Sequence, residues 1–182
     1  MIKSLFFKIK SLSKIDNIVY YEDEHSNLKI LPFGAHLKYK GAFGINEEIF
    51  SLFNFKKIEI PTHHVMYITN NKIIHFNGGQ HGWDPREASI EYNTVDNLKD
   101  WANKNKSDIY CCIHTDKDND SEITNRYLSL IGSKKYNPLT NNCEHFVNYC
   151  ITGTKISTQV NNLIDNIFDL GNNLFKKTVT KT

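Results

Sequence analysis

Apolar positions recur at helical spacing near both ends of the chain. Near the N-terminus these positions are Ile2, Leu5, Phe6, Ile9, Leu12 and Ile15, with lysines between them. The same period returns at Val160, Leu163, Ile164, Ile167, Leu170 and Leu174, ahead of a basic KKTVTK tail. Such spacing places one apolar stripe on a helix. We therefore predict an amphipathic helix at each end, either packed on the domain or lying on a membrane surface.

Between these ends, short runs rich in β-branched and aromatic residues predict strands. They cover 18–21, 28–31, 36–39, 63–68, 72–76 and 109–114. One further helix is predicted over 120–131, and another begins near Asn141. The range 78–108 is polar and predicts a long surface excursion. These elements give an α+β class.

The chain shows no internal repeat and no linker that would separate two large domains. We expect a central domain over 31–160, with an amphipathic segment over 1–30 and a C-terminal helix with its basic tail over 161–182. The 182 residues hold 22 basic and 20 acidic side chains, a net charge of +2. This charge is too small for the basic surface that nucleic-acid binding requires, so we expect no nucleic-acid partner.

The cysteines and the apolar runs indicate the compartment. Four cysteines stand at 111, 112, 143 and 150, without a C-x-x-C pair. This argues against a disulfide framework and against a zinc ribbon. Lysines interrupt the N-terminal apolar runs before they reach signal-peptide length, and no run is long enough to cross a membrane. We expect an intracellular, cytoplasmic protein that needs no cofactor.

Cys143 is the candidate nucleophile. It lies in the segment TNNCEHF, where Thr140, Asn141 or Asn142 can cap a helix and Glu144 can reach back to a free backbone N–H. A cysteine in the first helical turn meets the positive end of the helix dipole, which lowers the pKa of its thiol. The same N–H groups can bind an oxyanion. A buried cysteine that only fills space is the alternative.

A thiol nucleophile also needs a general base, and histidine suits this role near neutral pH. His63, His64 and His75 flank a hairpin signal, HHVMYI followed by Thr69 to Asn71 and KIIHF. A three-residue loop places Val65 opposite His75, so His63 shares a face with His75. A two-residue loop would place His64 there instead. We favour the first register, with His63 as the base and His75 as the residue that holds its ring.

Two other interpretations of these histidines stay open. Each can be a hydrogen-bonded strand histidine without a chemical role. A metal site built from His63, His64, His75 and His81 is conceivable, but no carboxylate or cysteine completes it at a recognised spacing. We therefore expect no metal.

The segment HHVMYITNNKIIHF at 63–76, followed by YNPLTNNCEHFVNYCITG at 136–153, resembles the LRAT-like family of H-box/NC proteins. This resemblance extends over roughly 31–160 and includes STQV after the cysteine. It implies a circularly permuted NlpC/P60 (papain-like) fold, with an antiparallel sheet packed against the helix that carries the cysteine. In this fold the histidines precede the nucleophile in the chain.

The resemblance also implies the site. The family's two histidines fall on His63 and His75, and its nucleophile falls on Cys143. Tyr67 matches the tyrosine of the H-box strand and would orient the reacting carbonyl, although an aromatic core residue is an equal alternative. Ile68 and Thr69 stand where many relatives have a hydrophobic residue and glycine, and the hydrophobic C-terminal anchor of several animal relatives is missing.

The implied activity is that of a thiol acyltransferase or phospholipase A. It would act on glycerophospholipid acyl esters through an acyl-thioester on Cys143, with water, an amine or an alcohol as acceptor and with peripheral contact to membranes. Two alternatives remain. The same residues could serve a papain-like peptidase or amidase, or the chain could be a non-catalytic, regulatory interaction module that keeps the motif for its fold.

Overall fold

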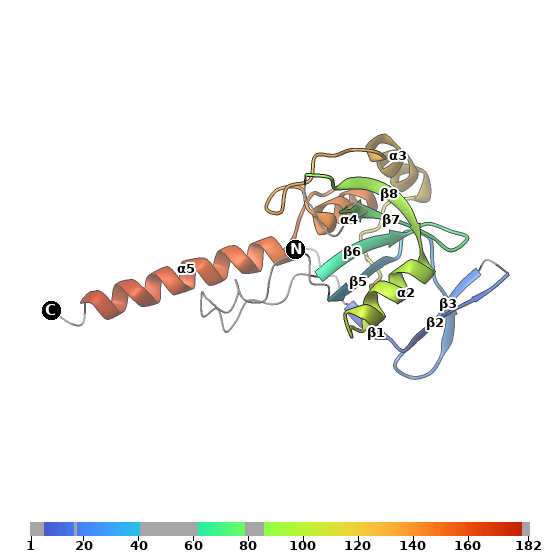
Figure 1. Ribbon diagram of the computed structural model, residues 1–182, viewed down its shortest axis with the longest axis horizontal. Helices are drawn as coiled ribbons and strands as arrows, with labels where there is room; N and C mark the ends of the chain where they lie inside the picture. The colour runs from blue at the N-terminus through green and yellow to red at the C-terminus, as the bar shows by residue number, and fades with distance from the viewer. Residues whose placement is uncertain (1–5, 17, 41–61, 79–85, 180–182) are drawn as a thin grey trace.

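The computed structural model describes residues 6–16, 18–40, 62–78 and 86–179 (Figure 1). Its strands are β1 (Phe6–Ile9), β2 (Ser11–Ile15), β3 (Ile18–Glu22), β4 (Leu28–Ile30), β5 (His36–Lys40), β6 (Thr62–Tyr67), β7 (Lys72–Asn77), β8 (Ser89–Thr94) and β9 (Ile109–Cys112). Its helices are α2 (Val95–Lys104), α3 (Asp120–Leu130), α4 (Cys143–Thr152) and α5 (Thr158–Val179). The fold is therefore α+β, as the sequence predicts.

The strands form two antiparallel sheets. The larger has the order β1-β9-β5-β6-β7-β8, and the smaller has the order β2-β3-β4. In the larger sheet, β9 lies between β1 and β5 and pairs with both. The sheet therefore joins strands that are far apart in the chain. The two strands that carry the candidate histidines, β6 and β7, lie next to each other near the middle of this sheet.

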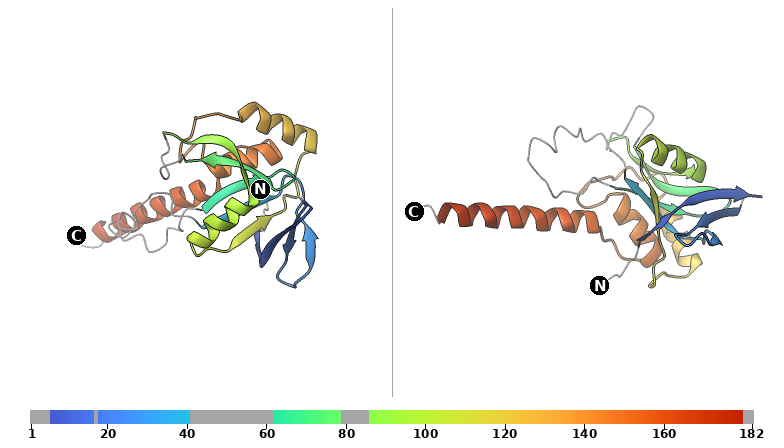
Figure 2. Two further views of the ribbon diagram at one scale, coloured as in Figure 1. Left: turned by 45° about the vertical axis from the view of Figure 1, so that its right-hand side comes forward. Right: turned by 90° about the horizontal axis from the view of Figure 1, so that it is seen from below.

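Helices cover the large sheet on both faces (Figure 2). On one face, Val65, Tyr67 and Ile73 pack with Leu98 of α2 and with buried residues of the small sheet. On the other face, Met66, Ile74 and Phe76 pack with α3 and α4. Because side chains alternate along a strand, neighbouring residues of β6 belong to different cores. Helix α4 contacts β6 and β7 directly.

Helix α5 leaves the body of the molecule and projects away from it (Figures 1 and 2). Val160 near its start is buried, whereas Ile164 and Phe168 are exposed. In the described part of the chain, no helix combines the length and the apolar character that crossing a bilayer would require.

The predicted N-terminal helix is wrong. The segment forms β1 and β2 instead, separated at Lys10. Phe6 and Phe7 lie opposite Cys112 and Cys111 of β9. The partner of β1 is about a hundred residues away and leaves no trace in a local pattern. Strand β2 instead pairs with the next strand, β3, through a turn that includes Asp16 with positive φ, and this pairing overrides the helical period.

The predicted surface excursion over 78–108 is wrong for its second half, which holds β8 and α2. The signals for α2 are present in the sequence. Thr94 caps the helix by accepting from the backbone N–H of Asn97, and Val95, Leu98 and Ala102 fall on its buried face. The many polar residues between these positions concealed the period.

Candidate active site

The β6–β7 hairpin has the three-residue loop that the sequence predicts. Met66 lies opposite Ile74 and Tyr67 opposite Ile73, and the backbone N–H of Ile68 donates to the Lys72 carbonyl. Asn70 and Asn71 both have positive φ, which asparagine tolerates better than most residues. This register places His63 and His75 on one face, where His63 Nε2 and His75 Nδ1 are 2.8 Å apart.

Aromatic side chains surround this histidine pair. Trp101 of α2 lies with its ring centre 5.2 Å from that of His75 and 6.4 Å from that of His63. Tyr39, opposite His63 in β5, makes an edge-on contact with the His63 ring. Burial lowers the pKa of His63 well below its usual value and lowers that of His75 to about 4. Both rings are therefore neutral at neutral pH.

Cys143 is the first residue of α4, and its sulfur reaches the backbone of β6. Sγ lies 3.8 Å from the carbonyl oxygen of Thr62. The backbone N–H of His64 also interacts with the sulfur and lowers the pKa of the thiol. These two peptide groups belong to the residues directly before and after His63. The ladder between β6 and β7 covers Met66 and Tyr67, so the thiol lies beside the backbone of the other half of β6. Cys143 packs in the core on the α4 face of the sheet, whereas the His63 ring points to the α2 face, against Trp101.

The predicted effect of the helix start on this thiol is outweighed. Backbone N–H groups of His64, Glu144 and Cys143 do lower its pKa, but burial has the larger effect and raises the pKa to about 12. Cys143 is only 4% exposed, so the thiolate would lose most of its solvation by water. The helix start therefore lowers the pKa of the thiol, as predicted, but burial outweighs this effect.

The cap of α4 is built differently from the prediction. Asn142 is the N-cap and accepts from the backbone N–H of His145, while the His145 ring, not Glu144, reaches back to the Asn142 N–H. Glu144 instead accepts from the Ser157 hydroxyl at 2.6 Å and from the Gln159 backbone N–H at 3.0 Å. The buried carboxylate therefore ties the start of α4 to the start of α5.

Gln159 also holds the strand residue that contacts the thiol. Its side-chain Oε1 accepts from the Thr62 N–H at 2.7 Å, and its Nε2 donates to the Thr62 carbonyl at 3.2 Å. Both backbone groups of Thr62 are thus fixed by one amide. Nothing in the local pattern around Thr62 or Gln159 predicts this contact. Gln159 belongs to the STQV segment, which is part of the family resemblance.

The tyrosines are arranged differently from the expectation. Tyr67 is buried in the core, and the backbone groups of Val19 and Asn71 interact with its hydroxyl. Tyr67 lies four positions further along the strand than His63, a distance of about 13 Å. Burial raises the pKa of Tyr39 and Tyr136, and a charge on the Cys143 sulfur raises it further, so these two tyrosines lie within electrostatic range of the thiol. The structure thus places Tyr67 with the hairpin and not with the thiol.

In the described ranges, no group of three or more His, Cys, Asp or Glu side chains is arranged to hold a metal ion. His81 lies outside the described residues. His63 and His75 lie on the opposite face of β6 from His64, which separates three members of the metal set considered above.

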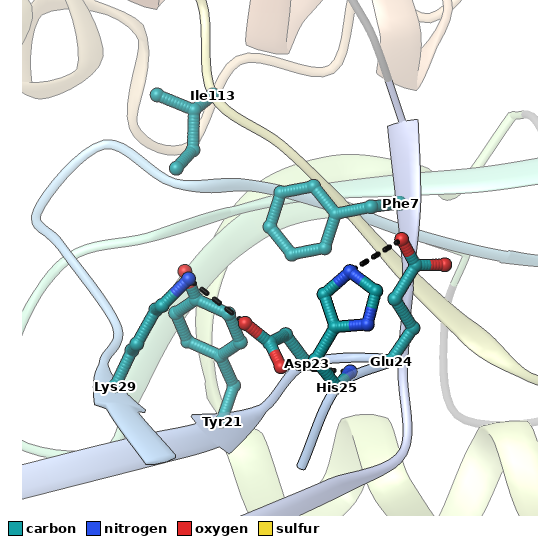
Figure 3. Close-up of a pocket in the computed structure, with 7 residues that line it drawn as sticks. All are labelled: Phe7, Tyr21, Asp23, Glu24, His25, Lys29 and Ile113. Carbon is teal, nitrogen blue, oxygen red and sulfur yellow. Dashed lines mark hydrogen bonds and ion pairs between the residues drawn. The ribbon is translucent and has the colours of Figure 1, made fainter. Parts of the chain in front are cut away.

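A cavity of about 280 Å³ lies elsewhere, lined by Phe7, Tyr21, Asp23, Glu24, His25, Lys29 and Ile113 (Figure 3). Asp23 and Lys29 form an ion pair in it at 2.8 Å, and Asp23 accepts from the backbone N–H groups of His25 and Asn27. These contacts fix the turn between β3 and β4. No residue of the Cys143 site lines this cavity.

Comparison with known proteins finds similarity in the same part of the chain. The family model for lecithin retinol acyltransferase matches residues 51–156, more than half of the chain. The chain is 46% identical to bovine (Bos taurus) lecithin retinol acyltransferase over 46 residues, 25% of this chain and 20% of that protein. It is 38% identical to lecithin retinol acyltransferase of Homo sapiens over 72 residues, 40% of this chain and 31% of that protein.

The matched segments thus span less than a third of either curated relative. No solved structure matches the chain significantly. The family match contains the hairpin histidines and the cysteine that begins α4, with β8, α2, β9 and α3 between them. The chain belongs to the lecithin retinol acyltransferase family.

Proposed function

We propose that this protein is a thiol acyltransferase of phospholipase A type, which takes an acyl group from a glycerophospholipid ester. One observation carries the proposal: the Cys143 sulfur lies against the peptide groups on both sides of His63, and the His63 ring is bonded to His75. The candidate nucleophile thus lies beside the backbone of the stretch of β6 that carries the candidate base, and this base is hydrogen-bonded to the residue that would orient it. The arrangement also suits a permuted NlpC/P60 fold, in which the histidines precede the cysteine.

The first half of the reaction forms a thioester. Because burial keeps the thiol protonated, His63 must remove its proton as the sulfur attacks the ester carbonyl. When His63 donates through Nε2–H to His75 Nδ1, the Nδ1 of His63 carries the lone pair for this task. His63 then returns the proton to the departing alcohol oxygen, and the acyl group stays on Cys143.

The second half releases the acyl group. His63 removes a proton from the acceptor, the acceptor oxygen or nitrogen attacks the thioester, and the thiol is restored with that proton. Water as acceptor gives hydrolysis, whereas an amine or alcohol gives acyl transfer. Backbone N–H groups at the start of α4 are suited to the oxyanion in both halves. The neutral phenols of Tyr39 and Tyr136 are suited to donate to the same carbonyl, the role expected above for Tyr67.

Trapping tests this proposal. Brief incubation with phosphatidylcholine labelled in its acyl chain, followed by acid quenching, is expected to leave label on the wild type. Cys143→Ala is expected to carry none, and His63→Ala much less than the wild type. Equal labelling of all three proteins would refute the mechanism.

A second candidate function is favoured by one observation. Burial raises the pKa of Cys143 to about 12, the same value as for Cys111 and Cys150, which are core cysteines. This similarity is what a non-catalytic interaction module would show. Iodoacetamide separates the two functions at neutral pH. The catalytic proposal expects faster alkylation of Cys143 than of Cys150, which lies in the same helix, and equal rates favour the interaction module.

A further inference from the structure

A second group of histidines lies on the other face of the sheet from His63 and His75. His36 of β5, His64 of β6 and His114 after β9 form a continuous row. His36 Nε2 is 2.6 Å from His64 Nδ1, and His36 Nδ1 is 3.0 Å from His114 Nε2. At one end, His64 Nε2 lies 2.7 Å from the Thr62 hydroxyl. The row therefore ends at the residue whose carbonyl contacts the Cys143 thiol.

This histidine row is shielded from water and has few charges around it. The three side chains are at most 5% exposed, and the Phe6 ring of β1 packs edge-on against His36 and His64. Lys38 of β5 lowers the pKa of His36 and His64, and Glu144 of α4 raises that of His36. Asp116 raises that of His114, with its carboxylate 3.9 Å from His114 Nδ1.

The position of Asp116 selects one direction for the hydrogen bonds. The Asp116 carboxylate is too far from His114 Nδ1 for a hydrogen bond, but its negative charge favours a hydrogen on that nitrogen, which leaves His114 Nε2 as an acceptor. His36 must then donate through Nδ1–H and accept at Nε2 from His64 Nδ1–H. His64 in turn accepts at Nε2 from the Thr62 hydroxyl. In the neutral row, all three histidines therefore carry their hydrogen on Nδ1.

We propose that His64, His36 and His114 form a proton-binding row that positions Thr62 beside Cys143, and that a single bound proton reverses the hydrogen bond between His64 and Thr62. The proton count requires this reversal. Each of the two contacts between rings holds one hydrogen, and His114 Nδ1 holds a third. A fourth hydrogen can only occupy His64 Nε2, whichever ring carries the charge. His64 then donates to Thr62 Oγ1, and the Thr62 hydroxyl hydrogen turns elsewhere.

The reversal acts on the catalytic site, and this part of the inference rests on the proposed function. Thr62 links the row to the thiol through its carbonyl, and the bound proton places a positive charge on the α4 side of β6. A positive charge near the sulfur favours the thiolate. Burial lowers the pKa of all three histidines, so the row is neutral at neutral pH and takes up its proton only under acidic conditions.

Nuclear magnetic resonance of the ¹⁵N-histidine-labelled full chain tests the row without reference to activity. At neutral pH, His36, His64 and His114 are expected to show a hydrogen on Nδ1 and a bare Nε2, the less common tautomer of free histidine. On acidification, Nε2 of His64 should gain a hydrogen in the same transition as the other two rings change. A bare Nδ1 on His64 or His36 at neutral pH, or three independent transitions, would overturn the proposal.

The variant His36→Gln tests the link to the thiol. Its amide can accept from His64 and donate to His114, so the row keeps its direction, but a proton can then be held only by His64 or His114 alone and not shared by three rings, so it binds at a lower pH. Alkylation of Cys143 should match the wild type at neutral pH and fall about tenfold below it under acidic conditions, as for the loss of a unit charge in a protein interior. His25→Gln, which removes an exposed imidazole, is the matched control and should follow the wild type.

If the alkylation rate of Cys143 depends on pH in the same way in His36→Gln and in the wild type, the link between the histidine row and Cys143 is refuted. If His36→Gln does not fold, His114→Gln at the outer end of the row makes the same test. The tautomer measurement on the wild type is independent of both variants. A failure to trap an acyl-thioester would refute the proposed function, but it would not affect the tautomers measured for the histidine row. Failure of the proposed function and failure of the proton-binding row can therefore be told apart.

Discussion

At the scale of single residues, the candidate site depends on which way each side chain points from β6. His63 and His64 are adjacent, yet His63 meets His75 and Trp101 while His64 meets His36. Strand alternation separates the two rings onto different faces. The sequence contains this information, because the loop length fixes the register and the register assigns the faces. That is why the pairing of His63 with His75 could be predicted.

Replacement of His75 tests its role in orienting His63. His75→Gln keeps an acceptor for the His63 Nε2–H, whereas His75→Phe removes it. We expect His75→Phe to lose much of the turnover rate, within the range of about 10²–10⁴-fold for general base catalysis, and His75→Gln to recover part of it. Steady-state kinetics should show the change in kcat with little change in KM. Equal activities of both variants would argue against this role.

The surroundings of the thiol could not be predicted from the sequence. Thr62 contacts the Cys143 sulfur, Gln159 holds the backbone of Thr62, and Tyr39 lies within electrostatic range of the thiol, and these residues are distant along the chain. Their chemistry is ordinary in isolation, and only the packing of β5, β6 and the start of α5 brings them together. The same packing excludes water, which is why the pKa of Cys143 is raised although its position at a helix start was predicted correctly.

At the scale of elements, the two helices with asparagine caps offer a matched comparison. Asn142 caps α4 and Asn119 caps α3, each accepting a backbone N–H with its side chain. Replacing either by alanine should cost about 1 kcal/mol of unfolding free energy. Asn142→Ala should also change the alkylation rate of Cys143, the next residue, whereas Asn119→Ala should not.

Urea unfolding and iodoacetamide kinetics on both variants measure these effects. If Asn142→Ala and Asn119→Ala alter the alkylation rate equally, the cap of α4 has no special effect on the thiol. If neither loses stability, the two asparagines do not act as caps.

Elements with a local signal were predicted well, and elements with a distant partner were not. The hairpin strands, α3, α4 and α5 each carry a cap, a turn or an apolar period in their own residues. The segment that forms β1 and β2 has a helical period, yet β1 pairs with β9, about a hundred residues further along the chain, and β2 pairs with β3. A pairing of that range depends on the assembled sheet and not on the residues of either strand.

At the scale of the whole molecule, the buried histidines make stability depend on pH. Burial lowers the pKa of His36, His63, His64 and His75. Below about pH 6.5 the unfolded chain therefore binds protons that the folded chain does not bind, so the free energy of unfolding falls as the pH drops. For His75 this pH window extends down to about 4. Each histidine contributes about 1.4 kcal/mol per pH unit within its window.

Urea unfolding at several pH values measures this dependence. We expect a constant unfolding free energy above the ordinary histidine pKa and a steep decline below it. His25→Gln should leave the curve unchanged because this imidazole is exposed. A flat curve down to about pH 5 would show that the rings are not buried in neutral form.

The most direct test of the central claim is the identity of the residue that becomes acylated. After brief reaction with phosphatidylcholine and quenching, tryptic digestion places Cys143 and Cys150 in one peptide, between Lys135 and Lys155, and fragment ions distinguish them. We expect the added mass of one acyl chain on Cys143 and none on Cys150. An acyl chain on another residue, or release of fatty acid without any acylated Cys143, would contradict it.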